Sequence, residues 1–487
     1  MKKIFSLIIV ILLFSNIISA QNNFQINSEL WYGGDKYDEI FAFVPHNDNG
    51  FIAVGSKGYH NAVSQPDIWI VKTDDIGGLI WEVTIGHADS SELAYDIIPT
   101  NDNNYIIVGE QYKFNNGSHE GWEGIVIKID EDGNQIWQKK YGDGTYSADV
   151  FKSIKQTNDG GFIICGTTKN FGAEWLDAWL YKIDEDGNEE WNATYGEEDY
   201  ELFKQVFQTS DNGYIACGFT SSDFANGDYD FYVVKTDETG NILWDNTYGT
   251  EVKDRAYSFL PLQNSNYLIS GSYLNAETNK FDIKLVEIEE TNGDVVWEQT
   301  YQDTTDCNEP VTAIETTDNC ILLTYTSGYI KVPPYPSTDL RILKINQNHE
   351  IVADTTIGGN GSEQINCIRY TENNNYLLAG RTTSVGAGFS DAWWIGIADL
   401  TAPPVNVEAQ DKNKEIYIYP NPSNGSFTIL NDGLQITNIE IIDITGKIIQ
   451  NQKLTINNSQ FTINKKGIYF IKVQTENQIF TQKLIVQ

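Results

Sequence analysis

The chain has 487 residues, of which 40% are hydrophobic and 21% charged, so it has the composition of a folded protein rather than a disordered one. Its formal net charge is −36, and the acidic charge lies in residues 21–400, because residues 1–20 and 416–487 are each net positive. Such an acidic body repels phosphate backbones, which argues against nucleic acid as a partner.

The first twenty residues are typical of a secretory signal peptide. Lys2-Lys3 precedes an almost wholly apolar run over residues 4–18, and the small residues Ser19-Ala20 end it. A membrane anchor is the alternative, but the run is short for a span and polar residues follow from Gln21. We predict cleavage after Ala20, and therefore no transmembrane helix in the mature protein.

A module of about fifty residues then repeats along the chain. One segment of it opens with an acidic residue and ends in tryptophan, and its copies are Asp67–Trp81, Glu123–Trp137, Asp177–Trp191, Asp230–Trp244 and Asp282–Trp297. The segment recurs at Asp339, with Ala353 in the tryptophan position, and begins again at Asp391. An apolar segment that mostly ends in glycine lies between these copies and occurs seven times, from Phe51–Gly55 to Tyr376–Gly380.

Each module predicts four short strands separated by hairpin turns. In the third module the expected strands are Val150–Gln156, Phe162–Thr168, Asp177–Ile183 and Glu189–Tyr195. The seventh module lacks its fourth strand, whereas residues 28–34 match the end of a fourth strand with no third strand before it. We therefore predict an all-β fold, a seven-bladed β-propeller over residues 21–400 whose N-terminal strand closes the last blade.

The blade motifs carry a family resemblance. Asp237–Trp244 resembles the tryptophan-docking motif of pyrroloquinoline-quinone-type propellers, and the D-F-x-x-x-K-x-D-x-x-G pattern, which Asp230–Gly240 matches, is similar to delta-60-type repeats of bacterial surface proteins. The resemblance implies the propeller fold, with each tryptophan packed between neighbouring blades.

The C-terminal segment has a different character. Residues 401–415 contain Pro403-Pro404 and read as a linker, and residues 416–487 alternate apolar residues with glycine turns, which predicts a small β-sandwich. This stretch resembles the type A sorting domain of the type IX secretion system. The positions that carry the resemblance are Tyr419, Pro420, Asn421, Pro422, Gly425, Gly446, Lys447, Gly467 and Tyr469.

That resemblance implies a Bacteroidetes-like host and a defined route of export. The signal peptide would take the chain across the inner membrane, and the type IX secretion machinery would take it across the outer membrane. A sortase would then remove the sorting domain, and the protein would be secreted or attached to the outer-membrane surface.

No catalytic motif stands in the sequence. The HExxH, GxSxG, P-loop and GxGxxG patterns are absent, and the five histidines share no position in the repeat, so no metal-ligand spacing arises. The five cysteines lack CxxC spacing, and Cys165 and Cys217 fall inside apolar runs, which predicts buried thiols.

The recurrent polar signal is acidic. Thirteen residues before each second strand stands a carboxylate, except for Asn308 in the sixth module; the set is Asp38, Glu92, Asp149, Glu201, Asp254 and Glu363. A second set opens each third strand, from Asp67 to Asp391. Because first and third strands run parallel, both sets should lie at one end of the propeller, the first around the channel mouth. They could fix loops through N–H bonds, which repetition favours, or form a ring that binds Ca²⁺, a cation or a sugar.

Recognition is expected at the loops between second and third strands, which differ between modules and carry aromatic residues such as Trp122, Trp175 and Tyr335. The positions facing the channel read as acidic or small. We expect a non-catalytic binding module for an extracellular glycan or protein, with Ca²⁺ as the one cofactor considered. The alternatives are a glycan-active or quinoprotein-like enzyme, which would need polar residues unique to one or two blades, and a structural surface-layer role.

Overall fold

The computed structural model describes residues 23–486 with gaps at 60–65, 88, 116–117, 143–146, 170, 173–174, 223–224, 226–227, 304–306, 329–337, 372–374, 402–415, 420–425, 432–435, 444–446, 454–458, 464 and 476–478. The predicted signal peptide with its cleavage after Ala20, and the linker apart from Thr401, lie outside the described residues. The chain divides into two compact units, residues 1–403 and 404–487.

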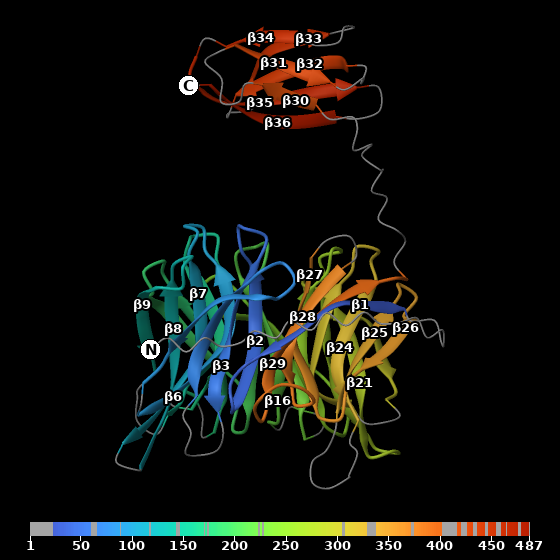
Figure 1. The fold of residues 1–487 in the computed structure, drawn as a ribbon. Helices are drawn as coiled ribbons and strands as arrows, with labels where there is room; N and C mark the ends of the chain where they lie inside the picture. Colours follow the sequence, from blue (N-terminus) through green and yellow to red (C-terminus); the bar gives the residue numbers. More distant parts are fainter. Residues whose placement is uncertain are drawn as a thin grey trace. The chain divides into compact units, whose positions relative to one another are not determined.

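The first unit is a seven-bladed β-propeller, as the repeat predicts (Figure 1). Its seven sheets each run from an innermost strand A to an outermost strand D. Blades 1 to 3 are β2–β5 (Tyr37–Pro45, Phe51–Tyr59, Asp67–Thr73, Leu79–Ile85), β6–β9 (Ser90–Pro99, Tyr105–Asn115, Ser118–Ile129, Gln135–Tyr141) and β11–β14 (Val150–Gln156, Phe162–Thr168, Asp177–Ile183, Glu189–Tyr195). The two-residue strand β10 (Ser147–Ala148) pairs with β8.

Blades 4 to 7 continue the pattern. They are β15–β18 (Glu201–Gln208, Tyr214–Thr220, Asp230–Thr236, Ile242–Tyr248), β19–β22 (Asp254–Pro261, Tyr267–Asn275, Lys280–Ile288, Val295–Tyr301), β23–β26 (Cys307–Glu315, Ile321–Ser327, Asp339–Ile345, Ile351–Ile357), and β27–β29 (Glu363–Tyr370, Asn375–Thr382, Asp391–Asp399) with β1 (Phe24–Tyr32). The four strands predicted for the third module are confirmed at the same boundaries.

The apolar runs of strands B and C are explained by burial on both faces. In blade 3 every residue of β12 and β13 is buried, whereas the outermost strand β14 begins with two exposed residues. Each propeller core cluster joins two adjacent blades, and one of them joins Phe43 and Trp69 of blade 1 to Leu377 and Trp394 of blade 7. The hydrophobic core is therefore a closed ring of interfaces between blades.

The N-terminal strand completes blade 7, as predicted. β1 pairs antiparallel with β29 from Phe24 opposite Asp399 to Tyr32 opposite Ala392, and Figure 1 shows it beside the strands of the last blade. The Trp393 indole donates to Glu29 Oε1 at 3.1 Å, as the Trp69 indole of blade 1 donates to Glu82 Oε2 at 2.8 Å. β1 thus makes the contact of an ordinary strand D.

The tryptophan that ends each repeat segment packs against the next blade. A Cβ added to the C–D turn glycine of that blade would lie 2.6 Å from Trp81 at Gly133 and 2.8 Å from Trp191 at Gly240. Both glycines have positive φ. The predicted wedge between blades is confirmed: each indole fills the space that a turn without a side chain leaves.

The same geometry explains why Ala353 replaces tryptophan in blade 6. Blade 7 takes its strand D from the N-terminus, so it has no C–D turn against which a blade 6 tryptophan could pack. At the interface between blades 7 and 1, β1 carries Ser28 in the tryptophan position, and its hydroxyl donates to the Ile76 carbonyl at 3.5 Å. The turn glycine Gly77 of blade 1 is instead contacted by Trp394 of β29.

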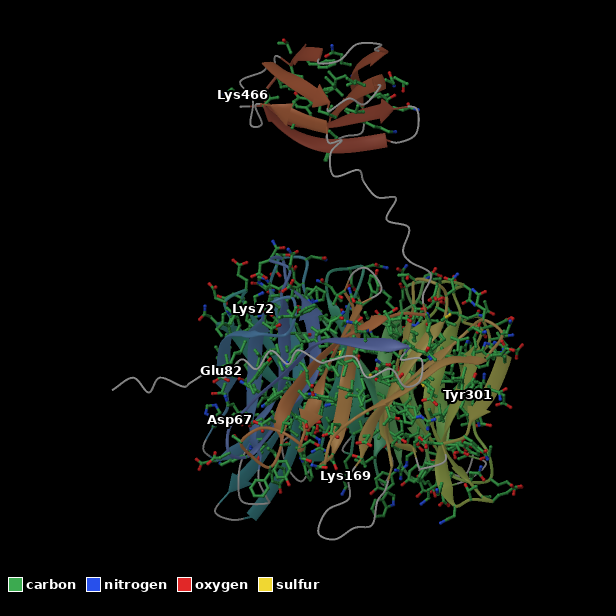
Figure 2. All side chains as sticks on the ribbon, turned by 45° about the vertical axis from the view of Figure 1, so that its right-hand side comes forward. Asp67, Lys72, Glu82, Lys169, Tyr301 and Lys466 are labelled. Atoms are coloured by element: carbon green, nitrogen blue, oxygen red, sulfur yellow. The ribbon has the colours of Figure 1, made fainter. Side chains whose placement is uncertain are left out.

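The propeller has two ends, defined here by their connections. The turn face holds the A–B and C–D turns, and the loop face holds the B–C loops and the D–A connections. Strand β4 runs between them, with Asp67 at its loop end and Lys72 near its turn end (Figure 2).

The second unit is the predicted small β-sandwich. One sheet holds β30 (Ile416–Tyr419), β31 (Ser426–Asn431) and β34 (Ser459–Thr462), and the other holds β32 (Ile436–Asp443), β33 (Ile448–Lys453), β35 (Gly467–Thr475) and β36 (Ile479–Val486). Both contribute to one core. Among the sorting-motif residues, Tyr469 is buried and donates to the Lys465 carbonyl at 2.8 Å, Gly467 begins β35, Tyr419 ends β30 and Lys447 is exposed. Pro420, Asn421, Pro422, Gly425 and Gly446 lie outside the described residues.

Candidate binding surfaces

The six carboxylates predicted to surround the channel mouth are all buried. Their exposed fractions are at most 1%, for Asp38, Glu92, Asp149, Glu201, Asp254 and Glu363. Each lies at the start of a strand A, at the loop face, as the repeat predicts. They therefore occupy equivalent places in six blades.

Their hydrogen bonds tie the connection between blades to the end of strand B. Thr250 donates to Asp254 Oδ2 through its amide and its hydroxyl, each at 2.8 Å, and the Gly359 amide donates to Glu363 Oε2 at 3.2 Å. From strand B, the Thr220 hydroxyl donates to Glu201 Oε1 at 2.6 Å and the Thr382 hydroxyl to Glu363 Oε1 at 3.0 Å.

The backbone at these positions joins neighbouring blades. The Glu201 amide donates to the Leu176 carbonyl at 2.7 Å, and the Asp254 amide to the Tyr229 carbonyl at 2.7 Å, with equivalent bonds at Asp38, Glu92, Asp149 and Glu363. Burial raises the pKa of Glu201, against the bonds from Ser222 and Thr220 that lower it. This geometry supports the loop-fixing role.

Binding of Ca²⁺ or another ligand by this set stays a prediction. Among the residues that the structure describes, no group of three or more His, Cys, Asp or Glu side chains is arranged to hold a metal ion. The second acidic set, at the start of strand C, is also largely enclosed, and burial raises the pKa of Asp67, Asp339 and Asp391. A Cβ on Gly86 would lie 1.9 Å from Asp67 Oδ1, so glycine at the end of strand D makes room for the carboxylate.

The loop face carries the exposed aromatic side chains. Five aromatic residues of the described propeller are strongly exposed, and all lie there: Trp122, Phe171, Trp175, Tyr200 and Phe389, at 38–50%. The other large hydrophobic side chains that the propeller exposes are aliphatic, such as Ile80 and Leu243 on outermost strands. Of the loop residues singled out in the sequence, Trp122 and Trp175 belong to this surface and Tyr335 lies outside the described residues.

Each of these rings lies against another aromatic ring, and two of the contacts cross a blade boundary. Trp175 of the blade 3 loop lies 5.7 Å from Tyr200 ahead of blade 4, and Phe389 of blade 7 stacks on Tyr37 of blade 1 at 5.3 Å, measured between ring centroids. Backbone bridges hold these junctions: Leu176 pairs with Tyr200 and Ser390 with Tyr37. The aromatic positions are thus built on the joints between blades.

The innermost strands differ from the prediction that the positions facing the channel are acidic or small, because they carry large aromatic and basic residues at their bulges. Strand A has a bulge at the third residue after the buried acid. In blades 1 to 5 this residue is Phe41, Tyr95, Lys152, Lys204 and Tyr257, respectively. The Lys152 ammonium lies 3.4 Å from the Tyr95 ring centroid. Burial, and then repulsion from Lys204, lower the pKa of Lys152 to about 8 against the attraction of Glu110. Bulge residues escaped the sequence pattern because they interrupt its alternation.

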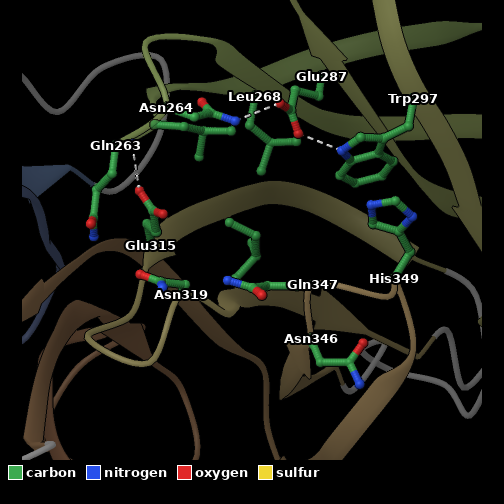
Figure 3. A pocket seen from close by; sticks show the side chains of 12 residues that line it. Gln263, Asn264, Leu268, Glu287, Trp297, Glu315, Asn319, Asn346, Gln347 and His349 are labelled. Carbon is green, nitrogen blue, oxygen red and sulfur yellow. Dashed lines mark hydrogen bonds between the residues drawn. The ribbon is translucent and has the colours of Figure 1, made fainter.

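The sequence also missed a pocket on the turn face, between blades 5 and 6. Its volume is about 460 Å³, and its walls include Glu287 and Trp297 of blade 5 and Glu315 and His349 of blade 6 (Figure 3). The His349 ring stacks on the Trp297 indole with centroids 4.0 Å apart. The departures of Glu287, Glu315 and His349 from the repeat were the signal that could have revealed it.

Comparison with known proteins identifies the second unit. Residues 417–487 match the family model described as a secretion system C-terminal sorting domain. The C-terminal unit is therefore a sorting domain of the type IX secretion system, and the protein is exported to the cell surface or secreted. No curated protein matches the chain in sequence. Within the described residues, no helix is long and apolar enough to cross a membrane.

Several solved structures are similar to the chain at low sequence identity. PorZ, a surface component of the type-IX secretion system of Porphyromonas gingivalis, is 11% identical with a TM-score of 0.44 over 94% of this chain, and the chain spans 60% of its length. A Dyadobacter fermentans protein of unknown function is 10% identical with a TM-score of 0.46, covering 77% of this chain and 99% of that one. The β-propeller domain of the Pyrococcus furiosus trilobed protease is 12% identical with a TM-score of 0.41, covering 77% and 99%.

Proposed function

We propose that the propeller is a non-catalytic binding module, which recognises an extracellular glycan or protein through its loop face. The observation that carries this proposal is that the five strongly exposed aromatic residues in the described part of the propeller all lie on that face. Exposing an aromatic ring to water is unfavourable, so burying it against a ligand is favourable, and aromatic residues often anchor binding surfaces. The loops stand on a closed scaffold, which keeps the rings in place before a ligand arrives.

Export fits this role. A sorting domain delivers the propeller to the outside of the cell, where glycans and other surface proteins are its neighbours. We further propose that a sortase of the secretion machinery removes the sorting domain, so that the propeller is the part that remains at work.

The test is a glycan array probed with the purified chain from residue 21, followed by titration of each hit and analysis of the glycan afterwards. Replacing Trp175 and Tyr200 together by alanine should weaken binding more than tenfold, because two paired rings are lost. Replacing Ile80 and Leu243 by alanine removes exposed apolar area of similar accessibility from outermost strands and should leave binding unchanged.

Two results would contradict the proposal. Equal loss of binding in both double variants would show that the loop face is not the site. Cleavage of a bound glycan would replace the binding module by the enzyme alternative.

A further inference from the structure

The pocket between blades 5 and 6 departs from a pattern that five of the other six blades share. In blades 1, 2, 3, 4 and 6, a lysine near the end of strand C pairs with an aspartate of the A–B turn of its own blade. The pairs are Lys72 with Asp48, Lys128 with Asp102 at 2.7 Å, Lys182 with Asp159 at 3.0 Å, Lys235 with Asp211 at 2.9 Å, and Lys344 with Asp318 at 2.6 Å.

Blade 5 reverses the charge at this place. Glu287 stands in the lysine position and Asn264 in the aspartate position. Glu287 is 7% exposed, and its carboxylate accepts from the Asn264 amide at 2.9 Å, from Asn266 and from the Trp297 indole. Where five blades place an ammonium group, buried in four of them, blade 5 buries a carboxylate.

Blade 6 contributes two more departures to the same pocket. Glu315 Oε2 accepts a hydrogen bond from the backbone amide of Gln263 at 3.0 Å. In other blades a neutral glutamine accepts the equivalent bond: Gln156 from the Asn101 backbone amide at 3.1 Å, and Gln208 from that of Asn158 at 2.8 Å. His349 stands at the turn position that glycine occupies in the first five blades, with φ of 64°.

These departures leave two negative charges facing one cavity. Among the described residues, no lysine, arginine or histidine forms an ion pair with Glu287 or Glu315, whose carboxylates accept from neutral amides and an indole. Figure 3 shows both carboxylates on the wall of the pocket, with the Trp297–His349 stack at one end and the amides of Asn319 and Gln347 beside them. Partly buried carboxylates without a cation are costly, and a cation entering the pocket would relieve that cost.

The pocket also has the size and lining of a small-molecule site. A volume of about 460 Å³ lies within the ordinary range for such sites, and Leu262, Leu268 and Ile321 add apolar wall to the polar groups. The acidic field of the whole propeller would concentrate cations at its surface. Because scaffold roles repeat from blade to blade, departures that meet at one cavity indicate a role that blades 5 and 6 alone perform.

We propose that this pocket binds a small organic cation, a primary ammonium or guanidinium group on a short carbon body, between Glu287 and Glu315. The charged group takes the place of the lysine that blade 5 lacks, and the body lies along the Trp297–His349 stack and the leucines. This site is on the turn face and is separate from the aromatic loop face.

The experiment is calorimetric titration of the purified chain from residue 21 at low salt. The probes are Nα-acetyl-lysine amide and Nα-acetyl-arginine amide, with the Nε-acetylated lysine derivative as a neutral control, and glucosamine against N-acetylglucosamine. For the probe type that the pocket accepts, we expect the cationic molecule to bind with an affinity at least tenfold higher than its neutral, acetylated counterpart. The affinity of the cation should fall as the salt concentration rises. The peptide-like and amino-sugar arms distinguish the two sources of such a cation.

Two variants use side chains that the repeat itself supplies. E315Q installs the glutamine of blades 3 and 4, and N264D/E287K installs the lysine–aspartate pair of blades 1, 2, 3, 4 and 6, so both should fold. Each should lower the affinity for the cation at least tenfold while the melting temperature is kept. Absence of cation binding in the natural chain at millimolar concentration, equal binding of the neutral twins, or unchanged affinity in E315Q and N264D/E287K would each overturn the proposal.

Discussion

At the scale of single residues, the repeat is held together by contacts between a large ring and a missing side chain. Trp191 reaches the C–D turn of blade 4 because Gly240 has no Cβ, and the Tyr195 hydroxyl donates to the Gly240 carbonyl at 2.7 Å. The turn glycine therefore serves two needs, a positive φ and space for the indole.

These two needs can be separated by substitution. Gly240→Ala should lower the free energy of unfolding by about 2–4 kcal/mol, because it adds both left-handed strain and overlap with Trp191, 2.8 Å from the added Cβ. Gly160→Ala is the matched control: its φ of 91° resembles the 86° of Gly240, but nothing lies within 4 Å of its Cβ, so about 1–2 kcal/mol is expected. Denaturant unfolding measures both. Equal losses would show that the wedge contributes nothing.

At the scale of elements, the lysine–aspartate pair fixes the A–B turn onto strand C in five blades. In blade 6 it also reaches across the last interface, because the Lys344 ammonium donates to Asp318 and to Asp399, the final residue of β29, both at 2.6 Å. The Lys344 side chain is 1% exposed, so its buried charge depends on these two carboxylates for compensation. The pair thereby anchors the last strand of the propeller.

Removing this cation should be costly. Lys344→Met should lower the free energy of unfolding by about 3 kcal/mol or more, since it leaves Asp399 buried without the lysine. Lys253→Met removes an exposed pair with Asp228 and should change stability by less than about 1 kcal/mol. Thermal or urea unfolding of the two variants measures the difference, and similar small losses would refute the anchoring role.

The same pairs predict the response to acid. Bonds from lysine and from turn groups hold the pKa of Asp48, Asp102, Asp159 and Asp318 below its usual value, and that of Asp211 at about 2. A depressed folded-state pKa gives stability that is present above the unfolded value near 4 and is lost as pH falls through the folded value. The melting temperature should therefore drop between about pH 4 and pH 2, and a flat profile across that range would contradict it.

The strands could be predicted from the sequence because their pattern is local. Strand boundaries in blade 3 follow from apolar runs between Asp-Gly turns, and closure follows from the unmatched strand at each end. The pocket could not be predicted in this way, because its residues come from two blades. Glu287 stands out only when it is compared with the lysines at the same position of five other blades. The buried state of the acidic set was also beyond the pattern, since burial depends on the loops of the neighbouring blade.

At the scale of the whole molecule, the propeller is stable as a ring rather than as a row of blades. Every core cluster of the propeller lies between two blades, so an open ring would leave the facing surfaces of blades 1 and 7 in water. β1 prevents this by adding a full strand to blade 7.

Deleting residues 24–34 should therefore lower the melting temperature sharply, by more than about 10 °C, since blade 7 loses its outermost strand and both termini are released. Deleting only residues 21–22 is the control, which keeps the bond from the Leu400 amide to the Asn23 carbonyl, and it should have no effect. Differential scanning calorimetry measures both. An unchanged melt after the longer deletion would refute the role of β1 in closure.

Closure by β1 also sets an order of events in time. β1, the first strand to be synthesised, pairs with β29, the last strand of the propeller to be synthesised. Glu29 and Trp393, which bond to each other, stand 364 residues apart in the chain. Until β29 has emerged, the growing protein is an open arc with two apolar ends, which proteases and chaperones can reach. A chain cut short anywhere before Asp399 stays in that state. Ring closure therefore shows that synthesis has reached Asp399, because only a chain that holds both β1 and β29 can close.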